Sequence, residues 1–121
     1  VQLSTSDDLL LTMRWIAILR GRAPLTLAAT GGVHTRDDVL KMLLAGADVV
    51  HLASTLLLNG PQQLATLLRE MQQWLEEREY VSVEQLKGAM SQQNLPDPGT
   101  WARAAYLDTL DAFSPPAGVR Y

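Results

Sequence analysis

Two short apolar runs joined through a helical segment limit most strongly what this chain can fold into. The first run covers Leu25 to Ala29 and stops at a Thr-Gly-Gly sequence, and the second covers Val49 to Ala53. Each run is too short for a helix and has the length of a buried strand. Because a helical pattern lies between them, the two runs predict a βαβ unit with parallel strands, and thus an α/β fold.

Helices are predicted before, between and after these strands. Ser6 is the expected N-cap of the first, and Thr35 begins the second with Asp38 as a capping-box partner. Pro61 stands at the first position of a third, where its missing N–H costs nothing. The predicted helices run from Asp7 to Arg20, from Thr35 to Gly46 and from Pro61 to about Glu77, with a short turn from Ser54 to Leu58.

The last third of the sequence has a different character. Ser82 and Gln85 are typical of the start of a short helix whose Leu86, Ala89 and Met90 face one way. A turn-rich connector follows, and a final amphipathic helix is expected with an apolar face of Trp101, Ala102, Ala105, Tyr106, Leu110 and Phe113. We therefore expect βα units in residues 1–78, appended helices in 79–113 and a flexible tail in 114–121.

Charge and composition remove several classes of function. The formal net charge of −3 argues against nucleic acid as a partner, because such proteins carry a basic stripe. The chain has no cysteine, which excludes a disulfide framework, a thiolate zinc site and a cysteine nucleophile within it. Its apolar runs are far shorter than the roughly 20 residues that span a bilayer, so no membrane association is predicted. A start at Val1 without a signal peptide indicates a piece of a longer, cytoplasmic protein.

The ends of the two predicted strands carry the residues that favour a phosphate site. Thr30, Gly31 and Gly32 lie between the first strand and a helix, where backbone N–H groups can turn toward an anion. Ala53, Ser54 and Thr55 lie at the same end of the second strand, and their small size and hydroxyls suit close contact with phosphate oxygens. A simple tight turn is the alternative explanation of the glycine pair. Neither a Walker A sequence nor GxGxxG is present.

The remaining polar residues have ordinary structural explanations. We expect His34 to be a solvent-facing residue near the helix cap and His51 to be a satisfied core or inter-layer residue. Helix capping explains Asp37 and Asp38 without a general acid or base, and their spacing from the histidines predicts no metal site. Solvated helix faces explain Arg36 and Lys41, and packing of the appended helices explains Trp74, Tyr80, Trp101 and Tyr106.

An ordered series of short motifs carries a family resemblance. It comprises Ala-Thr-Gly-Gly-Val-His-Thr from Ala29, Asp-Val from Asp38, Leu-Leu-Ala-Gly-Ala-Asp from Leu43, Ala-Ser-Thr-Leu-Leu from Ala53, Asn-Gly-Pro from Asn59, Trp-Leu-Glu-Glu from Trp74, Tyr80, and Ser-Val-Glu-Gln-Leu-Lys-Gly from Ser82. From about Trp15 to Phe113 the chain resembles the C-terminal part of dihydroorotate dehydrogenases. The likeness is greatest to the cytosolic class and to dihydroorotate dehydrogenase-like proteins.

The resemblance implies an FMN-dependent (β/α)8 TIM barrel that oxidises dihydroorotate to orotate in pyrimidine biosynthesis. Gly31 and Gly32 would contact the FMN phosphate through their N–H groups. The family's Gly-Thr after the last strand falls on Ala53 and Ser54, so a hydroxyl is kept. The family's catalytic base, flavin lysine and orotate-binding asparagines lie upstream of the matched part, so no catalytic residue is assigned here.

The expected fold is therefore the last two βα units of a TIM barrel followed by appended helices. Two strands cannot close a barrel, so the expected partner is either the N-terminal barrel part or a second copy of the chain. Two alternatives stay open: a non-catalytic module that self-associates as a half-barrel, and a fragment of another phosphate-binding TIM-barrel enzyme.

Overall fold

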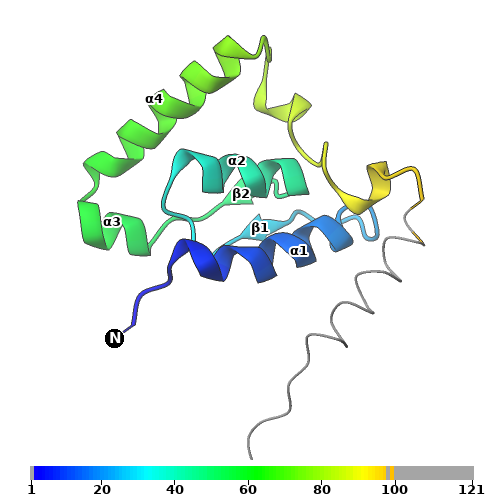
Figure 1. Cartoon of the computed structure of the whole chain (residues 1–121), viewed down its shortest axis with the longest axis horizontal. Helices are drawn as coiled ribbons and strands as arrows, with labels where there is room; N and C mark the ends of the chain where they lie inside the picture. Colours follow the sequence, from blue (N-terminus) through cyan, green and yellow to red (C-terminus); the bar gives the residue numbers. More distant parts are fainter. Residues whose placement is uncertain (1, 98, 100–121) are drawn as a thin grey trace, which may run out of the picture.

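Two short parallel strands lie at the centre of the molecule (Figure 1). The structure is a computed structural model, and it describes residues 2–97 and 99. Strand β1 (Ala28–Ala29) pairs in parallel with β2 (Val49–Val50), with Ala28 opposite Val49 and Ala29 opposite Val50. Backbone hydrogen bonds extend the ladder, because His51 N–H donates to Ala29 O at 2.8 Å. The predicted parallel pairing is confirmed, although the regular strands are shorter than the apolar runs.

The helices predicted before, between and after the two strands are present around this sheet. Their bounds are Ser6–Asp8 for the 3-10 turn η1, Leu9–Leu19 for α1, Arg36–Ala45 for α2, Ser54–Asn59 for α3 and Gln62–Glu77 for α4. Two further 3-10 turns follow, η2 (Val83–Gln85) and η3 (Gln92–Asn94). Among the described residues, no helix is both long and apolar enough to cross a membrane.

Of the two N-cap residues predicted from the sequence, Thr35 is confirmed and Ser6 is not. The Thr35 cap of α2 is confirmed, because its side chain accepts the Asp38 N–H at 3.2 Å while Asp38 Oδ2 accepts the Thr35 N–H at 2.9 Å. The prediction for Ser6 is wrong. Thr5 precedes the first turn instead, and its N–H donates to Asp8 Oδ2 at 2.8 Å. The Ser6 hydroxyl instead donates to Asp38 Oδ2 at 3.0 Å.

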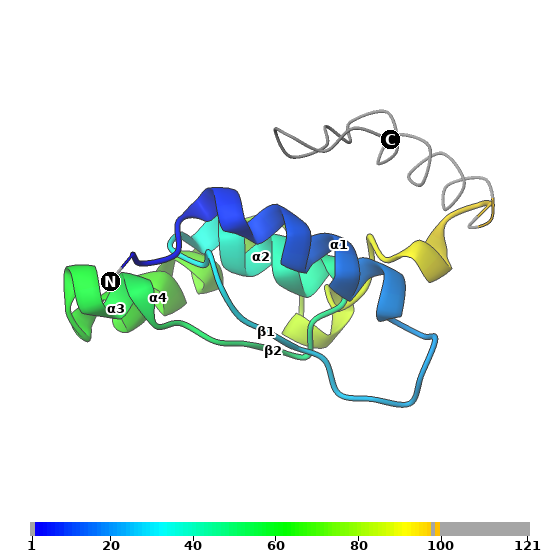
Figure 2. The ribbon, with the colours of Figure 1, turned by 90° about the horizontal axis from the view of Figure 1, so that it is seen from below.

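Among the described residues, helices cover one face of the strand pair and leave the other face exposed. Helices α1 and α2 pack on the covered face, as Figure 2 shows, and bury a core of Leu9, Ile16, Ala29, Val33, Val39, Met42, Leu43, Ala45 and Ala47. The opposite face exposes Ala28, Val49 and His51. The expectation of two fully buried strands is thus wrong for that face, and His51 is exposed rather than a core residue. Leu25, at the predicted strand start, is 68 % exposed.

The segment after α4 closes the carboxyl-terminal end of α2. Gly88 N–H donates to Leu43 O and Met90 N–H donates to Leu44 O, both at 2.9 Å. Leu86 is fully buried, as predicted, but Met90 is 71 % exposed and does not share its face. Instead of the predicted helix from Ser82, this segment contains the 3-10 turns η2 and η3.

Of the four aromatic residues predicted to pack the appended helices, Trp74 and Tyr80 lie in the described part of the chain, and they pack against each other. Trp74 stacks on Tyr80 with ring centroids 5.7 Å apart, and the Arg78 guanidinium lies 4.4 Å from the Trp74 ring centroid. The predicted final helix, with Trp101 and Tyr106, and the predicted tail lie outside the described residues.

An ion pair fastens the amino-terminal end of the strands. One Arg20 nitrogen donates to Asp48 Oδ1 at 2.8 Å and to Gly46 O at 3.1 Å, while Asp48 Oδ2 accepts the Leu27 N–H at 2.9 Å. The Leu27 N–H and then Arg20 lower the pKa of the Asp48 carboxyl. This network joins the end of α1 to the loops before both strands, and so fixes their register.

Candidate functional site

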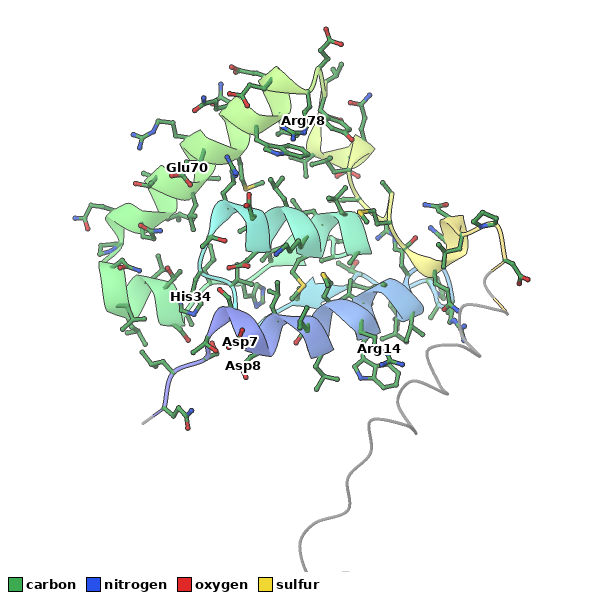
Figure 3. All side chains as sticks on the ribbon, viewed as in Figure 1. Asp7, Asp8, Arg14, His34, Glu70 and Arg78 are labelled. Atoms are coloured by element: carbon green, nitrogen blue, oxygen red, sulfur yellow. The ribbon has the colours of Figure 1, made fainter. Side chains whose placement is uncertain are left out.

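The carboxyl ends of β1 and β2 lie beside the segment that precedes α1. Ser4 joins all three: its hydroxyl accepts the Gly32 N–H at 3.2 Å and lies 2.8 Å from the Ser54 hydroxyl oxygen. The residues after both predicted strands are therefore brought together, as a parallel βαβ unit requires. Figure 3 labels His34 where this segment, α1 and α3 meet.

Gly31 and Gly32 have different surroundings, although both have positive φ, +92° and +74°. A Cβ on Gly31 would meet no atom within 4 Å, so open space lies above this residue. A Cβ on Gly32 would lie 2.6 Å from Leu9 N and 2.7 Å from Thr5 O. Gly32 is required by close backbone packing, whereas Gly31 leaves room for a ligand to approach the backbone.

The three residues after β2 also differ in their exposure to solvent. Ala53 is exposed and Ser54 is half-buried at the start of α3, with its hydroxyl toward Ser4. Thr55 is fully buried, and its hydroxyl lies 3.4 Å from His34 O and accepts from Asn59 Nδ2 at 3.2 Å. Thr55 and Asn59 thus connect the two loops on the buried side, whereas the Ser54 hydroxyl is paired with that of Ser4.

His34 and Asp38 organise the first loop. His34 is half-buried, and its Nε2 lies 2.6 Å from Ser4 O, so this nitrogen carries the donated proton. The prediction of a solvent-facing histidine is therefore wrong. Burial alone would raise the pKa of Asp38, but hydrogen bonds from the His34 and Thr35 N–H groups and from the Ser6 hydroxyl outweigh it and lower that pKa.

The chemistry that these groups support is binding of an anion. Gly31 offers an open backbone position, Ser54 offers a hydroxyl, and the buried carboxylate of Asp38 is fully engaged with its own loop. The expected capping role of Asp38 is confirmed. Thr30 is exposed, and its carbonyl oxygen lies 3.4 Å from the Thr12 hydroxyl. Within residues 2–97 and 99, no group of three or more His, Asp or Glu side chains could hold a metal ion.

Sequence reasoning missed Ser4, the residue that contacts both loops. Its signal was weak: it belongs to the hydroxyl-rich Ser4-Thr5-Ser6 run, which reads as ordinary helix capping. Only the tertiary fold places this run, 28 residues before Gly32 and 50 before Ser54, across the strand ends.

Comparison with curated proteins finds similarity to dihydroorotate dehydrogenases. A probable dihydroorotate dehydrogenase A (fumarate) of Enterococcus faecalis is 30 % identical over 73 residues, which are 60 % of this chain and 24 % of that protein. A dihydroorotate dehydrogenase (quinone) of Dichelobacter nodosus is 47 % identical over 55 residues, 45 % of this chain and 16 % of that protein. No protein-family model matches the chain.

A third relative shows the same pattern of partial coverage. The dihydroorotate dehydrogenase (fumarate) of Lachancea kluyveri is 31 % identical over 62 residues, 51 % of this chain and 20 % of that protein. The chain therefore matches less than a quarter of the length of each of these relatives. The suspected resemblance to dihydroorotate dehydrogenases is confirmed, over part of the chain.

Proposed function

We propose that this chain, which is similar over part of its length to dihydroorotate dehydrogenases, is the C-terminal part of an FMN-dependent oxidoreductase and holds the FMN phosphate. The open backbone position at Gly31 beside the Ser54 hydroxyl, at the ends of two parallel strands, carries this proposal. Phosphate sites of parallel βα folds lie at this end of the strands, often next to a short extra helix. Helix α3 has that place in the chain.

The residues present fit a phosphate group. Gly31 would donate its N–H, Ser54 would donate its hydroxyl, and Ala53 would limit how closely the phosphate approaches. The Gly32 N–H is already bonded to Ser4, so its contact with a phosphate requires the Ser4 hydroxyl to turn aside. When bound, FMN supplies the two-electron oxidation by which such enzymes convert dihydroorotate to orotate. We assign no catalytic residue to this chain.

The open sheet face supports the barrel part of the proposal. In a (β/α) barrel, helices cover the outer face of the strands, and side chains on the inner face pack with those of other strands. Helices α1 and α2 cover one face here, while Ala28, Val49 and His51 are exposed on the other. In the whole protein, we expect strands from the N-terminal part to pair with both edges and cover these residues.

Flavin reconstitution of the full-length protein tests this function. The purified protein would be incubated with FMN, freed of excess flavin and examined by absorbance. We expect bound flavin that dihydroorotate bleaches under anaerobic conditions. No bound flavin would contradict the cofactor assignment. If flavin binds but is bleached only by another reductant, the cofactor assignment stands and the assignment of dihydroorotate as substrate is contradicted.

A second candidate function has its own observation. Helix α1 exposes Leu10, Leu11, Trp15 and Leu19, with 44–67 % of each side chain accessible. Such a face suits a partner, which is the N-terminal barrel part in the first proposal and a second copy in a non-catalytic, self-associating module. Light scattering on the 121-residue chain decides between them. A stable monomer would contradict self-association, and a stable dimer that Trp15→Glu dissociates would support it.

A further inference from the structure

Three polar groups at the carboxyl ends of the strands converge on one residue, Ser4. The Gly32 N–H donates to Ser4 Oγ at 3.2 Å, and His34 Nε2 donates to Ser4 O at 2.6 Å. The Ser54 hydroxyl oxygen lies 2.8 Å from Ser4 Oγ. Two oxygen atoms of a single residue therefore lie where groups able to donate hydrogen bonds meet, and a bound phosphate would bring its own oxygens to such a place.

Ser4 supplies only uncharged acceptors to these groups. A hydroxyl and a carbonyl oxygen form weaker hydrogen bonds than a phosphate oxygen, because a charged acceptor roughly doubles the strength of the bond. The carboxylate of Asp38 accepts the N–H groups of His34 and Thr35 at 3.1 and 2.9 Å, whereas His34 Nε2 is directed to Ser4. A phosphate could therefore replace Ser4 as the acceptor of the His34 Nε2 proton.

Ser4 can leave these groups without unwinding α1, because the backbone that follows it is held independently. The Thr5 N–H donates to Asp8 Oδ2 at 2.8 Å, and the Asp8 N–H donates to Thr5 O at 3.0 Å. On the other side of Ser4, Gln2 is exposed and Leu3 is half-buried, and within the described part of the chain neither makes a hydrogen bond. A rotation of the backbone at Ser4 would thus release all three contacts together.

We propose that Ser4 is a latch on the phosphate site, and that His34 is a further phosphate-binding residue once the latch opens. A phosphate at the strand ends would displace both Ser4 oxygens. It would then receive hydrogen bonds from the Gly32 N–H, the Ser54 hydroxyl and His34 Nε2. The exchange is favourable for His34, because a charged acceptor replaces an uncharged one. This inference rests on the proposed function and adds His34 to Gly31 and Ser54 as a determinant of phosphate binding.

Substitution of His34 tests its role in binding. In the full-length protein, we expect His34→Leu to weaken FMN binding about fivefold and to leave riboflavin binding unchanged, because the lost bond to the phosphate outweighs the lost bond to Ser4. His34→Gln is the matched control, since it keeps a side-chain N–H donor and should stay within about twofold of the native protein. Unchanged or tighter FMN binding in His34→Leu would show that His34 only holds Ser4 in place, and would overturn the proposal.

A disulfide between positions 4 and 54 tests the latch. The chain has no cysteine, and side-chain oxygens 2.8 Å apart bring the pair Ser4→Cys with Ser54→Cys within reach of a disulfide. We expect the oxidised double variant to bind FMN about tenfold more weakly than the same variant after reduction, with riboflavin binding unchanged. Ser54→Cys alone, treated with the same oxidant, is the control and should show no such difference. Equal FMN affinities of the oxidised and reduced double variant would overturn the latch.

The native protein separates this proposal from the function on which it rests. If native protein binds FMN no more tightly than riboflavin, the proposed phosphate site is overturned, and the latch with it. If native protein prefers FMN and His34→Leu binds FMN equally well, the phosphate site stands and the role of His34 alone is overturned.

Discussion

The hydroxyl oxygens of Ser4 and Ser54 lie 2.8 Å apart, although 50 residues separate them in the sequence. Ser4 also accepts the Gly32 N–H, so one side chain connects the segment before α1 to the loops after both strands. A phosphate bound at Ser54 would share this hydroxyl or displace it. Ser4 therefore has a structural role in the ligand-free protein and competes for the donors that a phosphate would use.

Substitution of Ser4 separates these two roles. Ser4→Ala removes two half-buried hydrogen bonds, so we expect the free energy of unfolding to fall by about 1 kcal/mol in urea denaturation. FMN affinity should stay equal or rise, because the Gly32 N–H and the Ser54 hydroxyl become free to donate to a phosphate. Thr26→Ala, which removes an exposed hydroxyl, is the control. A large loss of FMN affinity in Ser4→Ala would contradict the competing role.

The two adjacent glycines should respond differently to alanine. Gly31→Ala meets no neighbouring atom and suffers only the strain of its positive φ, so we expect a stability loss of about 1–2 kcal/mol. Gly32→Ala adds a backbone clash with Leu9 and Thr5, and a loss above about 3 kcal/mol is expected. Thermal or urea unfolding of both variants checks this order. Equal losses would contradict the assigned surroundings.

Asp38 should make the protein sensitive to acid. Its pKa is lowered from 3.8 in the folded protein, so its charged form contributes stability above about pH 4, and this contribution is lost as pH falls through the lowered value. Asp38→Asn should cost about 2 kcal/mol at pH 7 and lose less stability than the native protein below pH 4. Unfolding measured from pH 2 to 7 tests this.

The neighbouring Asp37 provides the control for that experiment. Within the described part of the chain, its carboxylate pairs with Arg36 alone, and 60 % of its side chain is exposed. Asp37→Asn should therefore change stability at pH 7 by less than about 1 kcal/mol. If both asparagine variants behave alike, the hydrogen bonds from His34, Thr35 and Ser6 are not the source of the Asp38 effect.

The Arg20–Asp48 ion pair, at the amino-terminal end of the strands, should contribute more to folding stability than to FMN binding. Asp48→Ala leaves the Leu27 N–H without its acceptor and leaves the Arg20 nitrogen with Gly46 O alone, and we expect a loss of about 2 kcal/mol. FMN affinity should be unchanged, because the pair lies at the amino-terminal end of the strands. Unfolding and flavin titration on the same variant measure both effects. Weaker FMN binding in a folded Asp48→Ala protein would contradict this division.

The βαβ core could be predicted because its signals are local. Apolar runs, the Thr35–Asp38 capping box and Gly46 after α2 all act within a few residues. The exposure of Leu25 and His51 could not be predicted from the apolar runs alone, because the sequence of an apolar strand does not show which of its faces has a neighbour. One face is covered by α1 and α2, while residues on the other face are exposed in the described part of the chain.

The sequence predicted which residues form the candidate site, but not how the surroundings of neighbouring residues in it differ. Gly31 and Gly32 look equivalent in the sequence, and their difference arises because Leu9 and Thr5 pack against Gly32 alone. Ser54 and Thr55 are likewise adjacent hydroxyl residues, yet only Thr55 is fully buried. These differences depend on contacts between distant segments, which local sequence patterns do not contain.

Riboflavin lacks the phosphate of FMN, so it tests most directly whether this chain holds that phosphate. Titration calorimetry on the full-length protein would compare FMN with riboflavin, in the native form and in Ser54→Ala. We expect FMN to bind much more tightly than riboflavin, and Ser54→Ala to weaken FMN about tenfold while leaving riboflavin unchanged. Equal affinities for FMN and riboflavin in the native protein would contradict the account.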